Sequence, residues 1–361
     1  MDTPYKKILW MVLLLFTVQL TTAQERVSKT VEERFPLNDT GELTLENKYG
    51  TINLTGWDKN EVYIKITIKV KHKKKDNAKS LLRRVNPKFK SSSGYISVVS
   101  EISNKNTGWF ADFFNNANPI DTDRSHVQID YEVFLPQKAK LKVINRFGDV
   151  VVEDWNGSLR ALIEHGDLWL NDDLGKADII LKFGKIRAKN LNYASINIKN
   201  GTLDMENAKS LRLNSTGTNS SINAINSLEV YSNKDDISVE ELGTVYGDLK
   251  FSALEIKLLT TDVDLTMKIA DFRISKIEAT KAEVSIQQES SEILIGVAGF
   301  SHQFSATLEQ GVVRLPKSFE NVDSKMLDKG RKLREIKASY GSDKQGVIIV
   351  KGLKGIVTIN D

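Results

Sequence analysis

A sequence repeat constrains the fold of this chain more than any other feature. Residues 47–57 align without a gap on residues 145–155, and both segments read Asn, a basic residue, an aromatic residue and Gly, followed by alternating apolar positions and a final Trp. The second copy opens a series in which an apolar residue recurs about every 17 residues. The first apolar positions of successive units are Val150, Leu168, Ile186, Leu203, Ile222, Ile237 and Leu254. A repeat of this kind indicates that one structural unit is copied along the chain.

A second apolar series lies between the members of the first, so each unit contains two short strands. Its members are Leu162, Ile179, Ile196, Leu211, Leu228 and Val245. The residues around Ile196, Leu211 and Leu228 alternate between apolar and polar with the period of a β-strand. Equivalent apolar residues of successive units would then stack about 4.8 Å apart, which is the spacing of neighbouring strands.

A unit of about 17 residues predicts an all-β fold, a right-handed parallel β-helix or solenoid. A propeller blade needs about 40 residues, and parallel crossovers are almost always right-handed. An antiparallel β-sandwich is the alternative, because it also has a strand and a turn every 8–12 residues or so. The repeated Gly marks every second strand, which an antiparallel meander does not explain, so the pattern favours the solenoid. We expect glycines such as Gly148 and Gly166 to occupy a corner that needs positive φ.

Residues 1–23 have the pattern of a secretory signal. Lys6 and Lys7 precede an apolar run at residues 8–16, and small residues follow at 21–23. The alternative is an uncleaved N-terminal anchor, although the apolar run is short for a membrane span. The sequence therefore predicts an exported protein that is periplasmic, at the cell surface or secreted. Its lack of Cys excludes disulfides, thiol catalysis and a lipoprotein anchor.

Residues 24–136 are predicted to form a small β-rich cap with one short helix. Residues 62–70 alternate like a strand, and residues 76–85 have helical apolar spacing with Asp76 as the N-cap. A cap is expected because the open end of a solenoid is an exposed strand edge. The rest of the chain is predicted to contain the solenoid repeats at 137–290 and degenerate β coils at 291–361.

An irregular loop is predicted at residues 104–125, inside the cap. It holds a cluster of aromatic residues that we take as a candidate partner contact: Trp109, Phe110, Phe113 and Phe114. Long loops without secondary structure are often functional, and exposed aromatic side chains suit contact with a protein, a glycan or a membrane. The alternative is a hydrophobic plug that folds back over the cap.

Positive charge is concentrated in one stretch of the chain. Residues 65–90 contain eleven Lys and Arg and a single acidic residue, Asp76. Such a stretch either contacts an anionic surface or forms a solvated hairpin tip and helix face. Few aromatic residues lie between these cations, so nucleic acid is not predicted as a partner.

The sequence predicts no catalytic, cofactor-binding or metal-ligating residues. HExxH, GxSxG and Gly-rich phosphate-loop motifs are absent from it. His165 occupies the aromatic position of a repeat unit, which predicts a stacking role. Asp149 and Asp167 would stack on one face with Lys185 one coil further, and carboxylate pairs can hydrolyse glycosides. The structural alternative is an ion pair with Lys185 or the common use of Asp in turns.

The chain resembles a known family of exported proteins. The resemblance rests on residues 47–57, on the strand Tyr-Glu-Val-Phe-Leu-Pro at 131–136 and on the Asn-Arg-Phe-Gly-Asp opening at 145–149. In these features the chain is similar to the adhesin domain family of Bacteroidetes-type bacteria, with auto-transporter-adhesin-like β-solenoids. The resemblance implies a β-solenoid with a surface or periplasmic address and brings no catalytic residues with it.

The sequence as a whole predicts an exported, non-enzymatic, adhesin-like β-solenoid that binds or scaffolds, with an envelope protein or a polysaccharide as partner. Stacked repeats create extended faces suited to such partners. The outward residues of the clearest coils are mixed in character: Val151, Trp169, Arg187 and Asp204. Two alternatives stay open, a polysaccharide-active enzyme using Asp149 and Asp167 and a periplasmic sensor or envelope-stress partner. We expect no cofactor, and no transmembrane segment once the signal is removed.

Overall fold

The computed structural model describes residues 25–102 and 126–361, and this part of the chain is all-β with one helix. Its residues divide into two compact units. The smaller unit comprises, among the described residues, 25–30, 67–86, 101–102 and 126–128, and the larger comprises 31–66, 87–100 and 129–361. Five strands contribute residues to both units: β1 (Glu25–Pro36), β4 (Glu61–His72), β5 (Val85–Ser92), β6 (Tyr95–Ile102) and β7 (His126–Pro136).

The smaller unit is built around helix α2 (Lys75–Arg84). The helix buries Ala78 and Leu81 against Val70. The predicted helix is confirmed, but Asp76 does not cap it, because the helix begins one residue earlier and its N-cap, Lys74, makes no side-chain capping bond. Asp76 instead lies in the first turn, where a carboxylate favours the positive end of the helix dipole. No helix in the described part of the chain has the length and apolar character needed to cross a bilayer.

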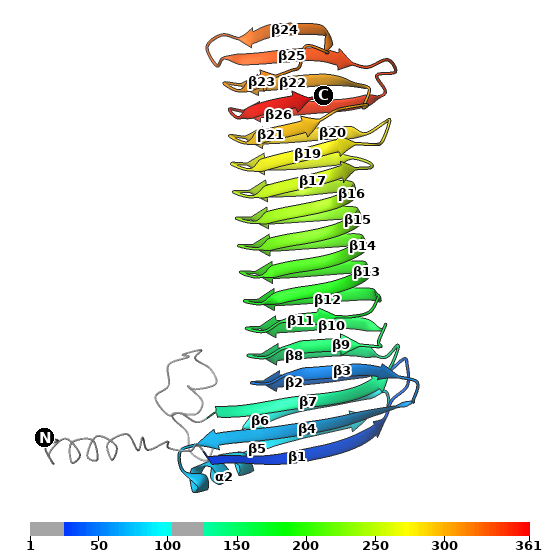
Figure 1. Cartoon of the computed structure of the whole chain (residues 1–361), viewed down its shortest axis with the longest axis vertical. Coiled ribbons are helices and arrows are strands. Elements are labelled where there is room, and N and C mark those ends of the chain that lie inside the picture. The colour runs from blue at the N-terminus through cyan, green and yellow to red at the C-terminus, as the bar shows by residue number, and fades with distance from the viewer. Residues whose placement is uncertain (1–24, 103–125) are drawn as a thin grey trace, which may run out of the picture. The chain divides into compact units, whose positions relative to one another are not determined.

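The larger unit contains a long, mostly parallel stack of strands (Figure 1). Two ladders run through its first part. One ladder contains β2 (Glu42–Lys48), β8 (Lys140–Arg146), β10 (Ser158–Glu164) and β12 (Leu174–Lys182). The other contains β3 (Ile52–Trp57), β9 (Val150–Glu153) and β11 (Leu168–Leu170). We call one strand of each ladder together, such as β8 with β9, a rung.

The predicted stacking of the repeat is confirmed by the strand register. Leu168 lies between Val150 and Ile186 on neighbouring strands, and all three side chains are fully buried. The gapless alignment of the first two copies is confirmed as well, since Asn47 pairs with Asn145. The first copy therefore lies on the rung next to the second, although almost a hundred residues separate them in the chain.

In two places the structure corrects the apolar series by two residues. Leu203 lies beside Ser220, not Ile222. Likewise Ile196 lies beside Leu213, two positions beyond the partner expected from the sequence. Residues two apart on a strand face the same side, so the apolar pattern alone does not distinguish these registers.

A third correction is a slip of one residue. Leu162 lies beside Ile180, whereas Ile179 lies beside Ala161. Leu162 consequently points out of the core and is half-buried. Three consecutive apolar residues occur in both strands, so their sequence does not fix which of them alternate inward.

Further along the stack, the two predicted strands of each unit merge into one. These long strands of 15 residues are β13 (Lys185–Lys199), β14 (Thr202–Thr216), β15 (Asn219–Asn233) and β16 (Asp236–Lys250). Paired residues of neighbours in this run are 17 positions apart, as Leu203 and Ser220 are. Shorter strands continue both ladders: β17 (Ala253–Leu259), β18 (Val263–Lys268), β19 (Asp271–Ile277), β20 (Glu283–Glu289) and β21 (Glu292–Gly296).

The C-terminal strands do not follow chain order. The chain forms β22 (His302–Glu309) and β23 (Val312–Arg314), and its last strands, β26 (Gly346–Leu353) and β27 (Ile356–Asn360), then return to lie between β20–β21 and β22–β23. Two antiparallel strands, β25 (Leu333–Tyr340) on β22 and β24 (Glu320–Asp328) on β25, end the ladder (Figure 1). Strand β24 is exposed, charged and irregular in register, features that protect an edge strand from pairing with other chains.

The repeated corner of the larger unit also differs from the sequence-based prediction. The aromatic-position residues, such as Phe147 (φ 56°) and His165 (φ 55°), take the positive φ, and the glycines after them do not. Gly is required there for a different reason: a Cβ on Gly166 would lie 2.0 Å from the carbonyl oxygen of Gly148 on the rung below. Close stacking of backbones, rather than a left-handed conformation, therefore selects Gly at this position.

Candidate functional site

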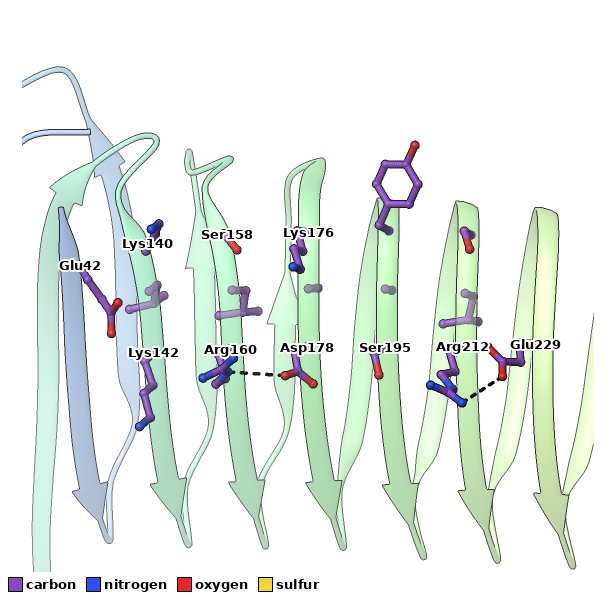
Figure 2. A pocket seen from close by; sticks show the side chains of 17 residues that line it. Glu42, Lys140, Lys142, Ser158, Arg160, Lys176, Asp178, Ser195, Arg212 and Glu229 are labelled. Atoms are coloured by element: carbon purple, nitrogen blue, oxygen red, sulfur yellow. Dashed lines mark ion pairs between the residues drawn. The ribbon is translucent and has the colours of Figure 1, made fainter. Parts of the chain in front are cut away.

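An open groove of about 580 Å³ crosses the outer face of the first ladder (Figure 2). Its lining residues come from seven neighbouring strands, β2, β8, β10, β12, β13, β14 and β15. Alternation along each strand turns every second residue outward, and the parallel register stacks these outward residues into two rows. Short side chains such as Ser158 and Ser195 separate longer ones and hollow the surface.

The first row of the groove combines cations, a hydroxyl and an exposed aromatic ring. Lys176 lies between Ser158 and Tyr193 in the strand register. At the β2 end of the row, Lys140 and Glu42 are register partners on neighbouring strands. Tyr193 is 62% exposed. An exposed ring of this kind offers an apolar face and a polar hydroxyl to a ligand.

The second row contains the charged pairs of the groove. Arg160 Nε lies 3.5 Å from Asp178 Oδ2, and Arg212 Nη2 lies 3.1 Å from Glu229 Oε1. Each arginine is thus neutralised by the carboxylate of the next strand, as the dashed lines in Figure 2 show.

Three lysines give the groove its positive charge. Lys140, Lys142 and Lys176 make no ion pair within residues 25–102 and 126–361. With the two arginines they place five cations in the lining against three carboxylates. Such a surface attracts an anionic ligand.

The described residues offer binding chemistry and no metal site. Among them, no group of three or more His, Asp or Glu lies close enough to hold a metal ion. The groove lining holds Ser, Lys, Arg, Tyr and carboxylates but no His. Its chemistry is therefore that of polar contacts, charge and ring packing.

Asp149 and Asp167 lie on neighbouring rungs outside the groove, where both act as backbone hydrogen-bond acceptors. Asp149 Oδ1 accepts from the backbone N–H of Asp167 at 2.9 Å, and Asp167 Oδ1 accepts from that of Lys185 at 2.8 Å. The ammonium group of Lys185 lies 3.3 Å from Asp204. The alternative interpretation of the sequence, a structural turn role for these aspartates, matches this geometry.

His165 has the stacking role that the sequence predicts. Its ring lies 4.9 Å from that of Phe147 and 4.8 Å from that of Phe183, nearly parallel to both. Tyr49 extends the stack at 5.2 Å from Phe147. The four rings form an aromatic ladder along the corner that precedes the repeated Gly.

The outward residues singled out in the sequence form one row on the second ladder. Val151, Trp169, Arg187 and Asp204 pair in that order on neighbouring strands. Arg187 Cζ lies 4.7 Å from the centre of the Trp169 ring, and its Nε lies 3.4 Å from Asp204. Arg187 thus contacts both of its neighbours in the row, which makes this row less available to a ligand than the groove.

Trp109, Phe110, Phe113 and Phe114, the contact residues predicted from the sequence, lie outside the described residues. Sequence reasoning missed the groove. A signal for it exists: once the register is known, positions 140, 158, 176, 193 and 210 fall into one row at the repeat spacing.

Comparisons with known proteins give only remote likenesses. No family model matches the chain, and no curated protein matches it. A Parabacteroides merdae protein named "putative adhesin" is 12% identical, covers 73% of this chain and 96% of its own, and has a TM-score of 0.38. A Parabacteroides distasonis protein of the same name is 13% identical, with coverages of 73% and 96% and a TM-score of 0.32. A "putative lipid binding protein" from P. distasonis is 12% identical, with coverages of 92% and 96% and a TM-score of 0.29. TM-scores this low carry no argument about this chain.

Proposed function

We propose that this chain is an exported, non-enzymatic, adhesin-like binding protein that holds an anionic polysaccharide along the groove, at the cell surface or in the periplasm. The observation that carries the proposal is the groove itself, with Lys140, Lys142 and Lys176 free of ion pairs among the described residues. Carboxylate or sulfate groups of a polysaccharide would supply the missing partners.

The length of the groove supports a polymer rather than a small ligand. It crosses seven strands, and six steps of about 4.8 Å give a length of roughly 29 Å. Cations and hydroxyls recur along it, so a chain with regularly spaced anionic groups can make the same kind of contact several times. The groove is also open, which suits a long ligand better than an enclosed cavity would.

The finer architecture belongs to the same proposal. A right-handed solenoid with coils of about 17 residues accounts for strand partners that are 17 or 18 positions apart between β8 and β19. The proposal also includes two further points: residues 1–23 are a secretory signal, and the chain is a member of the adhesin domain family. Trp109, Phe110, Phe113 and Phe114 are proposed as a second contact, independent of the groove.

Binding to polygalacturonate, a polysaccharide of carboxylated sugars, tests the proposal. We expect the purified chain to bind it and the Lys140→Gln, Lys142→Gln, Lys176→Gln triple variant to bind roughly 3- to 100-fold more weakly, because each of three exposed ion pairs contributes about 0.2–1 kcal/mol. Calorimetric titration measures the difference. No reducing ends should appear in the mixture, since the groove is proposed as non-catalytic.

A matched control removes three cations elsewhere. The Lys75→Gln, Lys79→Gln, Arg83→Gln variant of α2 has the same change in net charge and should keep wild-type affinity for polygalacturonate. Equal weakening by both triple variants would mean that overall charge, not the groove, governs binding. Equal affinity of wild type and groove variant would contradict the proposed site.

A further inference from the structure

The smaller unit carries far more positive charge than the rest of the chain. Its described residues include ten Lys and Arg against three acidic residues. The described residues of the larger unit, by contrast, have a net charge of −3. Nothing in the groove or in the proposed function uses this concentration of cations.

Helix α2 arranges part of this charge in a row. Lys75, Lys79 and Arg83 are four residues apart and exposed, so they lie on one face at steps of about 6 Å along the helix axis. Asp76 is the only acidic residue of the helix.

Few acidic groups neutralise this row. Lys75 Nζ lies 3.8 Å from Glu25 Oε2, and no ion pair involves Lys79 or Arg83 within the described residues. Among residues 25–102 and 126–361, two cations of the row therefore have no acidic partner, and the third has one long ion pair.

The apolar face of α2 is already occupied. Ala78 and Leu81 are buried against Val70 in the core of the smaller unit. The helix therefore has no free apolar face to insert into a lipid bilayer or into a hydrophobic groove. A partner of the exposed face is held by charge, and it has to present several negative groups across about 12 Å of helix.

The sequence before Glu25 indicates which anionic partner the exposed face of α2 would meet. The described part of the smaller unit begins with that residue, and the 24 residues before it contain the apolar run 8–16. As a signal or as an anchor, this run brings the following residues to a membrane surface. We infer that the exposed face of α2 binds the anionic headgroups of a phospholipid membrane and so holds the protein at that surface by electrostatic attraction.

Co-sedimentation with lipid vesicles tests the inference on the chain as purified after export. One vesicle preparation contains phosphatidylglycerol mixed with phosphatidylcholine, and the other contains phosphatidylcholine alone. We expect binding to the anionic vesicles only, weakening as salt is added because exposed charges are screened. The α2 triple variant, Lys75→Gln, Lys79→Gln, Arg83→Gln, should lose roughly 100-fold in vesicle affinity, since each cation near an anionic leaflet contributes about 1 kcal/mol.

The groove triple variant is the matched control for the same experiment. It removes three cations from the larger unit and should bind anionic vesicles like wild type. Gln has a helix propensity close to that of Lys and Arg, and the groove lysines are at outward-facing positions of β8 and β12. Both variants should therefore keep the wild-type circular dichroism spectrum and melting temperature.

Three results would overturn the inference. The first is equal binding to neutral and anionic vesicles, and the second is unchanged vesicle affinity of the α2 variant. The third is binding of the groove triple variant to soluble dextran sulfate at a salt concentration that already releases this variant from vesicles, which would assign the helix face to a polysaccharide. Each outcome is independent of polygalacturonate binding in the groove.

Discussion

Single residues at the repeated corner show how closely the rungs approach each other. A non-glycine residue in the left-handed conformation costs about 1–2 kcal/mol, and Phe147 and His165 both adopt it. Each of these rings stacks on two neighbours, and an aromatic pair contributes about 0.5–1.5 kcal/mol. Ring stacking can therefore offset the backbone strain at the aromatic position. Gly is needed instead at the next position, where no side chain fits.

A different set of residues stabilises the corner where the aromatic ladder has ended. Asp235 is buried, and its Oδ2 accepts hydrogen bonds from the hydroxyls of Ser215 and Ser232, both at 2.6 Å. Its Oδ1 accepts from the backbone N–H of Thr218 at 2.8 Å. Short polar side chains replace rings here, because a buried carboxylate needs several donors.

Gly166→Ala should destabilise the larger unit by at least about 2 kcal/mol, because overpacking against a backbone carbonyl has no flexible side chain to relieve it. Its Cβ would lie 2.0 Å from the oxygen of Gly148. Gly175→Ala is the control, since no atom lies within 4 Å of the Cβ that it would gain. Urea unfolding measures both; equal stability of the two variants would refute the close stacking of the corner.

At the scale of the strands, much of the fold can be predicted from sequence because each strand alternates and each rung repeats. The pairing of Val150, Leu168 and Ile186 is predicted correctly for that reason. The errors at Leu162 and Ile222 occur where consecutive or alternate apolar residues allow two registers. The insertion of β26 between β20 and β22 is not predictable from the repeat, since chain order and spatial order differ there.

The C-terminal strands contain a buried histidine with an unmet hydrogen-bonding group. His302 is fully buried and stacks on Phe300 at 5.0 Å. Its Nδ1 donates to the carbonyl oxygen of Phe300 at 2.8 Å, so Nε2 is the unprotonated nitrogen, and no described residue hydrogen-bonds to it. Burial lowers the pKa of His302 below its ordinary value of 6.5.

Acid should therefore weaken the packing of the C-terminal strands. The folded state keeps His302 neutral, whereas the unfolded chain takes up a proton as the pH falls below about 6.5. The contribution of the neutral His302 to the free energy of unfolding is fully present above that pH. Below it, the free energy of unfolding falls by at most about 1.4 kcal/mol per pH unit, until the lowered pKa of the folded state is reached. Melting temperatures at pH 7.5 and 5 measure the effect.

His302→Phe keeps a ring of similar size and removes the titrating group. This variant should lose the part of the acid sensitivity that His302 contributes. If His302→Phe and the wild type lose the same stability between pH 7.5 and 5, the buried histidine is not the cause.

At the scale of the larger unit, the candidate site depends on register across distant segments. Glu42 and Lys140 line the same groove and occupy partner positions on neighbouring strands, although they are far apart in the chain. No local pattern in the sequence indicates such a site, because each strand contributes only one or two outward residues. The contact residues predicted from the sequence, such as the aromatic residues at 109–114, are neighbours in the chain. A cluster of that kind can be recognised without knowledge of the fold.

The concentration of charge, in contrast, is visible in the sequence alone. What the structure adds is that Lys75, Lys79 and Arg83 of this stretch are exposed in one row on α2, and that a second, separate set of cations lies in the groove of the larger unit. The two triple variants separate these surfaces, since each is expected to lose one kind of binding and keep the other.

The affinity of the chain for polygalacturonate fragments of increasing length tests the central claim most directly. If the ligand lies along stacked rungs, each added contact is intramolecular once the first is made. Calorimetric Kd values should then fall as the fragments lengthen and level off when a fragment spans the groove, roughly 29 Å for six strand steps. Affinity that is the same for the shortest and the longest fragments would contradict a docking face built from successive rungs.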